Sequence, residues 1–78
     1  MHTLIPLKLF TTSNCHLCDQ AAALLHHHSK RLTQVEISDN DELLAIYGVR
    51  IPVLQRSDNL SELDWPFNTA DIAKFLCP

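Results

Sequence analysis

The sequence has 78 residues, of which 46% are hydrophobic and 19% are charged, and this balance is typical of a compact domain and excludes a disordered chain. Six basic against nine acidic residues give a net charge of −3 with the histidines neutral, so a nucleic-acid-binding surface is not expected. No apolar run approaches the ~18 residues of a membrane span, and the first residues lack the basic start of a secretory signal. We therefore predict a single cytoplasmic domain over residues 1–78, a monomer with one modest core and neither a membrane nor a nucleic-acid partner.

The first predicted elements are a strand and a helix joined by a polar turn. Residues 7–11 alternate in polarity and are rich in β-compatible side chains, which predicts a strand. Ser13 or Asn14 is expected to cap a helix over residues 15–28. Apolar side chains recur along this segment at helical spacing; they are Leu17, Ala21, Leu24 and Leu25.

The next pair of elements is a second strand and a short helix. Residues 33–38 alternate again, with Val35 and Ile37 on one face. In residues 38–41 a serine is followed three positions later by an aspartate, which predicts a helix cap at Ser38 for a helix that ends at Gly48. Two strands joined by a helix of this length form a βαβ unit with parallel strands and a right-handed crossover.

The last third of the sequence predicts a hairpin followed by a helix. Strands are expected at residues 53–55 and 60–65, separated by a turn at residues 57–59. Pro66 ends the hairpin, and Asn68 or Thr69 caps a final helix with an apolar face. The predicted order is β-α-β-α-β-β-α.

Two cysteines three positions apart, Cys15 and Cys18, stand at the predicted start of the first helix. The N–H groups of a first helical turn lack partners and the helix dipole is positive there, so a thiolate at Cys15 is favoured. Cys18, one turn further in, is the more shielded thiol and could resolve a mixed disulfide formed on Cys15. In a reducing compartment a close pair is more often catalytic or metal-binding than structural; a metal-binding pair and an inert pair are the alternatives to this redox interpretation.

A proline, Pro52, directly precedes the third predicted strand. A cis bond between Ile51 and Pro52 would make the turn and leave the Ile51 backbone free to pair with an extended thiol ligand. Arg50, just before this pair, is interpreted as a solvated charge, with pairing to a carboxylate of glutathione or of a peptide as the alternative.

Three features in this order resemble the glutaredoxin-like proteins of the thioredoxin superfamily: the strand and turn before the C-x-x-C motif of residues 15–18, the segment at residues 49–53, and the β-β-α ending. The resemblance implies an α/β fold of the thioredoxin/glutaredoxin type, with a four-stranded mixed sheet flanked by three helices. It also implies that Cys15 attacks, that Cys18 resolves and that Pro52 is a cis-proline. The implied activity is thiol–disulfide exchange on disulfide-containing or glutathionylated proteins, with no bound cofactor and with glutathione or a reductase as the reductant.

The sequence departs from the glutaredoxin pattern at three places. His16 and Leu17 replace a proline and an aromatic residue, residues 11–14 lack a lysine that pairs with glutathione, and residues 64–68 replace a Gly-Gly and Asp segment that holds its other end. A non-catalytic binding or redox-sensor module is therefore the alternative function. The expected substrate or glutathione contacts are Ile51, Pro52, His16, Arg50 and Trp65.

Several further residues have two interpretations each. His16 is either a simple exposed residue or an imidazolium that stabilises the Cys15 thiolate. Three successive histidines, residues 26–28, are interpreted as a solvated helix end, because successive helical side chains point about 100° apart and cannot converge on one metal ion. Cys77 is interpreted as a small apolar residue or an exposed tail thiol. Trp65 and Phe67 are expected to pack in the core, with a substrate surface as the alternative.

Overall fold

A computed structural model describes residues 5–28 and 31–77 of the chain; the first four residues, on which the expectation of no secretory signal partly rests, lie outside this part. The predicted order of elements is confirmed. In chain order the elements are β1 (Leu7–Thr11), α1 (His16–His26), β2 (Leu32–Glu36), α2 (Asp41–Tyr47), β3 (Val53–Arg56), β4 (Glu62–Asp64) and α3 (Thr69–Leu76). Within the described residues, no helix combines the length and apolarity that a membrane span needs.

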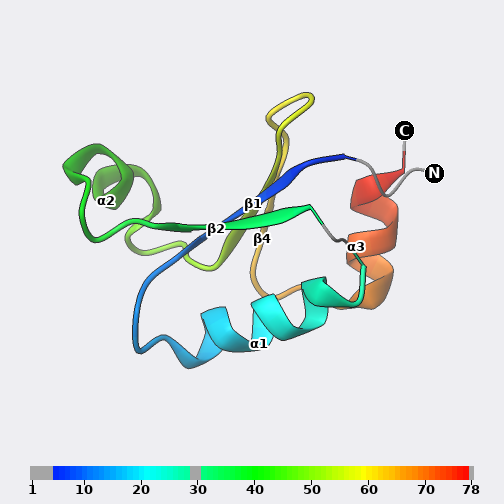
Figure 1. Cartoon of the computed structure of the whole chain (residues 1–78), viewed down its shortest axis with the longest axis horizontal. Coiled ribbons are helices and arrows are strands. Elements are labelled where there is room, and N and C mark those ends of the chain that lie inside the picture. The colour runs from blue at the N-terminus through cyan, green and yellow to red at the C-terminus, as the bar shows by residue number, and fades with distance from the viewer. Residues whose placement is uncertain (1–4, 29–30, 78) are drawn as a thin grey trace.

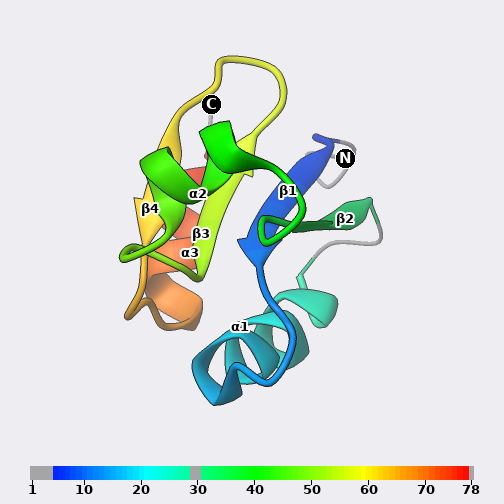
Figure 2. The ribbon, with the colours of Figure 1, turned by 90° about the vertical axis from the view of Figure 1, so that its left-hand side faces the viewer.

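The four strands form one mixed sheet (Figure 1), and their order, β2-β1-β3-β4, can be followed across Figure 2. β1 runs parallel to β2, as the βαβ unit predicts, and β3 runs antiparallel to β4, as the hairpin predicts. β1 and β3 join these two pairs and are antiparallel. The register pairs Thr11 with Glu36, Phe10 with Val53, and Val53 with Asp64. The turn after β1, the loop before β3 and the segment after β4 therefore meet at one end of the sheet, which we call the cysteine end.

The sheet separates two layers of helices. Figure 2 shows α2 in front of β3 and α3 behind it. Because strand side chains alternate between faces, Leu9 and Leu54 pack with α1 and α3, whereas Phe10 and Val53 pack with Tyr47 of α2. The single core expected from the sequence is thus divided by the sheet into two buried clusters.

Two of the predicted helix caps are wrong. The cap of α1 is Cys15 and not Ser13 or Asn14, because Asn14 adopts a left-handed conformation (φ 57°) inside the turn, which asparagine tolerates better than most residues. The cap of α2 is Asn40, whose side chain accepts from the Leu43 N–H at 3.0 Å. Ser38 instead belongs to the turn after β2, where its N–H donates to Glu36.

The other boundaries differ from prediction by a few residues. α1 ends at His26, with His27 as its C-cap, and β2 ends at Glu36. β4 is shorter than expected because Leu60 lies in the hairpin turn, where its φ is 61° and its N–H donates to the Arg56 carbonyl at 2.9 Å. Asn68 caps α3 in a reciprocal capping box with the residue three positions on, so one of the two predicted caps is confirmed.

A buried arginine at the end of β3 holds α3 in place. Arg56 is only 7% exposed. Its guanidinium donates to both carboxylate oxygens of Asp58, at 2.9 and 2.6 Å, and to the carbonyls of Phe75 and Cys77, at 2.7 and 3.1 Å. It thereby satisfies carbonyl groups at the C-terminal end of the helix, which lack partners within the helix.

Candidate active site

Cys15 and Cys18 are joined by a disulfide at the start of α1, with their Cα atoms 5.2 Å apart. The Cys15 Sγ accepts a hydrogen bond from the Cys18 N–H at 3.2 Å, so the sulfur takes the position of a capping side-chain oxygen. Cys15 is half-buried, whereas Cys18 is 2% exposed. Cys15 is therefore the more accessible of the two cysteines, and Cys18 is shielded from solvent.

The turn that leads to Cys15 is anchored by Glu36, at the end of β2. The Ser13 hydroxyl donates to one carboxylate oxygen at 3.2 Å, and the Ser38 N–H donates to the other at 3.1 Å. Hydrogen bonds, of which that from the Thr12 side chain has the largest effect, lower the pKa of Glu36 from 4.5 to about 2. The carboxylate is thus ionised at neutral pH and ties the cysteine turn to the neighbouring strand.

The peptide bond between Ile51 and Pro52 is cis, as the resemblance implies. Pro52 is buried, and its carbonyl accepts from the Trp65 N–H at 3.3 Å. The expectation that the Ile51 backbone is free is wrong for its N–H, which donates to the Tyr47 carbonyl at 3.1 Å. The tight turn after α2 uses that donor, so a ligand that pairs with Ile51 would use the carbonyl.

Trp65 and Phe67 follow β4 at the cysteine end. Their rings meet edge to face, with centroids 4.9 Å apart, an arrangement favoured between aromatic side chains. Phe67 belongs to the cluster beneath α1 and α3, and half-buried Trp65 packs against it. Both residues therefore pack as predicted, and Trp65 retains some exposed surface.

The register gathers most of the predicted site residues at the cysteine end. Cys15 follows β1 by four residues, and Pro52 directly precedes the strand that pairs with β1. Trp65 directly follows β4, and its N–H is hydrogen-bonded to the Pro52 carbonyl. His16 is exposed in the first turn of α1, next to the disulfide.

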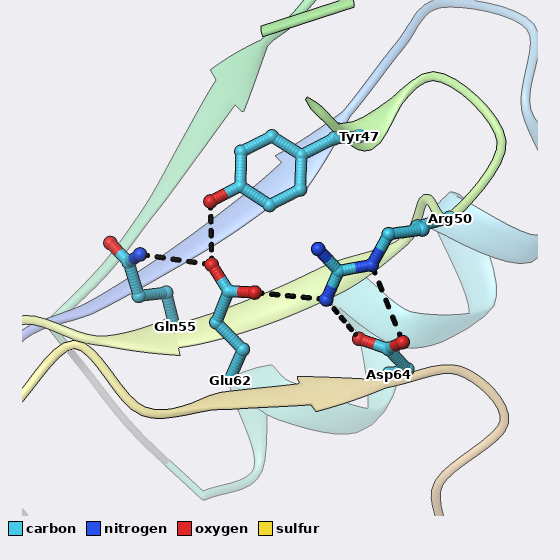
Figure 3. Close-up of polar contacts among 5 residues, drawn as sticks. All are labelled: Tyr47, Arg50, Gln55, Glu62 and Asp64. Atoms are coloured by element: carbon cyan, nitrogen blue, oxygen red, sulfur yellow. Dashed lines mark hydrogen bonds and ion pairs between the residues drawn. The ribbon is translucent and has the colours of Figure 1, made fainter. Parts of the chain in front are cut away.

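Arg50 lies in a polar cluster on the α2 side of the sheet (Figure 3). Its Nη2 donates to Asp64 at 2.7 Å and to Glu62 at 2.9 Å, and its Nε lies 3.4 Å from the second oxygen of Asp64. Its guanidinium carbon lies 5.3 Å from the centre of the Tyr47 ring, a cation–π distance. Arg50 is therefore not the solvated charge that the sequence suggests, because two carboxylates of β4 already bind it.

The rest of the cluster surrounds Glu62. The Tyr47 hydroxyl donates to it at 2.5 Å, and the Gln55 amide donates at 3.1 Å. Burial and the hydrogen bond to Glu62 raise the pKa of Tyr47 from 10.0 to about 12. Burial alone would raise the pKa of Glu62, but the hydrogen bonds from Tyr47 and Arg50 outweigh it and lower that pKa. The Arg50 pKa is raised by its hydrogen bonds to Asp64 and Glu62.

Sequence reasoning missed Glu36, Tyr47, Glu62 and Asp64. For Glu62 and Asp64 a signal was present, because residues two apart on a strand face the same side of a sheet. The two carboxylates could therefore have been expected on one face. For Glu36 the signal was weaker, because the strand was predicted to end at Ser38 and only its parallel pairing with the strand before the cysteines pointed to this end of the sheet.

The remaining candidates lie elsewhere. Cys77 is an exposed free thiol, one of the two predicted alternatives. His26 and His27 are exposed, and among residues 5–28 and 31–77 no group of three or more metal-ligating side chains comes together.

Comparison with known proteins places these features in a family. The profile of the Glutaredoxin-like domain (DUF836) matches residues 6–77. The X-ray structure of protein XcR50 from X. campestris is 37% identical, covers 92% of this chain and 99% of its own, and has a TM-score of 0.85. Its solution structure has a TM-score of 0.82, with 36% identity and coverage of 95% and 97%. Protein Ne2328 from Nitrosomonas europaea is 27% identical, with coverage of 94% and 92% and a TM-score of 0.79. A search of curated proteins finds no match.

Proposed function

This chain belongs to the glutaredoxin-like domain family (DUF836), and on that premise we propose that it is a thiol–disulfide oxidoreductase that works through Cys15 and Cys18. The observation that carries the proposal is the unequal access to the two sulfurs. Cys15 is half-buried at a helix N-terminus and accepts a backbone hydrogen bond, whereas Cys18 is 2% exposed. This is the arrangement that an attacking thiol and a resolving thiol require.

The reaction begins from the reduced pair. The Cys15 thiolate attacks one sulfur of a substrate disulfide, forms a mixed disulfide and releases the other substrate sulfur as a thiolate, which takes up a proton from water. Cys18 then loses its proton and attacks the Cys15 Sγ, which forms the intramolecular disulfide and releases the second substrate thiolate. The substrate gains two electrons and the cysteine pair loses two, so the exchange needs no bound cofactor.

The surrounding residues support the first step. The Cys18 N–H, 3.2 Å from the Cys15 Sγ, and the positive end of the α1 dipole stabilise the thiolate. Glu36 holds the turn before the nucleophile through Ser13. The proposed substrates are disulfide-containing or glutathionylated proteins, and glutathione or a reductase returns the pair to the dithiol.

The test is an equilibrium titration in glutathione buffers of graded potential, quenched by alkylation and analysed by intact and peptide mass spectrometry. All proteins carry Cys77→Ser, which removes the exposed thiol and its intermolecular disulfides. We expect a reversible Cys15–Cys18 disulfide with a midpoint of about −200 to −300 mV, the range of thioredoxins, glutaredoxins and the glutathione pool.

Two serine variants separate the roles of the cysteines. Cys18→Ser should accumulate a glutathione adduct on Cys15, because the resolving thiol is absent. Cys15→Ser should form no such adduct and should not reduce disulfide substrates. Thiols that stay unreactive at every potential, or full turnover by Cys15→Ser, would contradict the proposal. If Cys15→Ser still forms a stable complex with a partner protein and the wild type shows no exchange activity, the protein is instead a binding module.

A further inference from the structure

Arg50 and Asp64 bring part of the polar cluster to the cysteine end, on the α2 side of the sheet (Figure 3). Arg50 precedes the cis Ile51–Pro52 bond directly, and Asp64 directly precedes Trp65, whose N–H donates to the Pro52 carbonyl. Arg50 is therefore two residues before Pro52 in the chain, and Asp64 is next to the residue that is hydrogen-bonded to Pro52. A substrate seated against the cis-proline loop is then close to this pair.

Arg50 is chemically suited to bind a carboxylate of an incoming ligand, because a guanidinium forms paired hydrogen bonds with carboxylates. Its side chain is 33% exposed, so an external carboxylate could approach it. Yet its Nη2 and Nε already donate to Asp64, and Nη2 also donates to Glu62. The edge of the guanidinium that carries Nε and Nη2 is therefore occupied, and an anionic ligand that forms paired hydrogen bonds with this edge has to displace a carboxylate of the protein itself. A contact through Nη1 alone would lack this pairing.

The net charge of the cluster also opposes the binding of an anionic ligand. One guanidinium faces two carboxylates, and the Tyr47 hydroxyl keeps its proton at neutral pH, which leaves the cluster with a net charge of −1. Glu36 brings a further ionised carboxylate to the same end of the sheet. A second anion at this end is therefore repelled, whereas a neutral or cationic group is not.

We propose that Glu62 and Asp64 are specificity-determining residues: by occupying Arg50 they select neutral or cationic thiols and disulfides over anionic ones such as glutathione, which carries two carboxylates and one ammonium group. This inference rests on the proposed exchange at Cys15. The favoured substrate is a protein disulfide flanked by neutral or basic residues. Glutathione reacts without the carboxylate contact that Arg50 could otherwise supply.

The binding test does not depend on catalysis. Oxidised wild-type protein is titrated with S-methylglutathione, which cannot exchange, and binding is followed by the NMR amide shifts of Ile51 and Val53. Asp64→Asn should tighten binding roughly threefold to fivefold, the scale of one partly exposed charged contact. Adding Arg50→Gln to Asp64→Asn should return the affinity to that of the wild type or below, which shows that the gain passes through Arg50.

Asp58→Asn is the matched control. Asp58 also pairs with an arginine, Arg56, but at the opposite end of β3, so its loss changes the net charge equally and leaves the cysteine end intact. It should leave the affinity unchanged. If Asp64→Asn binds S-methylglutathione no more tightly than Asp58→Asn, including the case in which neither binds, the proposal is overturned.

A kinetic comparison tests the same idea with three small disulfides that differ in charge: glutathione disulfide (anionic), hydroxyethyl disulfide (neutral) and cystamine (cationic). Relative to the neutral compound, Asp64→Asn should speed the reaction with glutathione disulfide roughly threefold to fivefold and slow that with cystamine. An equal change for all three would show an effect on loop position and not on charge, and would refute the proposal. If the wild type reacts with none of them, the proposed exchange activity is refuted. The binding titration then still decides whether Asp64 prevents Arg50 from binding a ligand carboxylate.

Discussion

Tyr47 is the only tyrosine in the chain, so its ionisation reports directly on the polar cluster. Its ring stacks on Phe10 with centroids 4.0 Å apart, and its hydroxyl donates to Glu62 at 2.5 Å. Burial and this hydrogen bond raise its pKa from 10.0 to about 12. We predict that Tyr47→Phe removes one component of the loss of stability at alkaline pH.

The size of the effect follows from the pKa. Each factor of ten in proton affinity corresponds to about 1.4 kcal/mol, so a rise from 10.0 to about 12 sets an upper limit of roughly 2.7 kcal/mol. Because the Glu62 side chain is 25% exposed, solvent screening reduces this to about 1–2 kcal/mol. At neutral pH, loss of the hydroxyl hydrogen bond in Tyr47→Phe costs roughly 1 kcal/mol.

The sign follows from proton counting. Between pH 10.0 and about 12 the unfolded chain has lost the phenolic proton while the folded chain retains it, so the free energy of unfolding falls as the pH rises. The stability that neutral Tyr47 contributes is therefore complete below pH 10.0 and is lost as the pH passes through about 12. Phenylalanine does not titrate, so the variant lacks this loss.

Two measurements check this reasoning. The near-ultraviolet absorbance of the phenolate gives the pKa of Tyr47 in the folded protein. Urea unfolding, followed by the fluorescence of Trp65, the single tryptophan, gives the stability of both proteins at each pH. The difference in the free energy of unfolding between the wild type and Tyr47→Phe should become smaller above pH 10.0. A phenolate that titrates at the value of free tyrosine, or an advantage that stays constant with pH, would refute the argument.

Three further predictions concern stability. The wild type should lose part of its free energy of unfolding as the pH falls from 4.5 through about 2, because a carboxylate with a lowered pKa stabilises the fold only while it is ionised. Glu36→Gln should lack this part at every pH, so acid unfolding should show the two stabilities converging at low pH. Arg56→Met should lower the urea midpoint more than Asp58→Asn does, because Arg56 also donates to two carbonyls at the end of α3; equal midpoints would contradict this. Ile72→Ala, at a fully buried position, should cost about 2–5 kcal/mol in urea unfolding, and a cost near zero would show that α3 does not need this contact.

The order of the elements was predictable because it depends on local patterns. Alternation marks β1, and helical spacing marks α1 over two and a half turns. The errors fall where several residues could serve equally well. Ser38 and Asn40 are both good caps, and only the path of the chain after β2 decides that Asn40 takes the role. Leu60 looks like a strand residue, but the hairpin turn requires a left-handed conformation there.

The candidate site was predictable to the extent that its residues are close in sequence. The C-x-x-C spacing and its place after a strand identify Cys15 and Cys18, and the proline before β3 identifies the loop beside them. The Arg50 contacts to β4 span 12 and 14 positions, and the bond from Ser13 to Glu36 spans 23. Such pairs depend on strand register, which composition and periodicity leave open.

The proposed chemistry and the proposed selectivity depend on different elements of this fold. The cysteine pair lies at the start of α1, where the helix dipole favours a thiolate at Cys15. The charges beside the loop before β3 come from Arg50 and from β4, a three-residue strand at the edge of the sheet. Asp64 lies on an edge strand and outside both buried clusters, so substitutions there can change the surface charge without disturbing the core. Glu62 also accepts the hydrogen bond of the buried Tyr47, so its replacement affects both the charge and the packing. The C-x-x-C motif therefore carries the proposed reaction, whereas the proposed selectivity among substrates depends on the residues around Arg50.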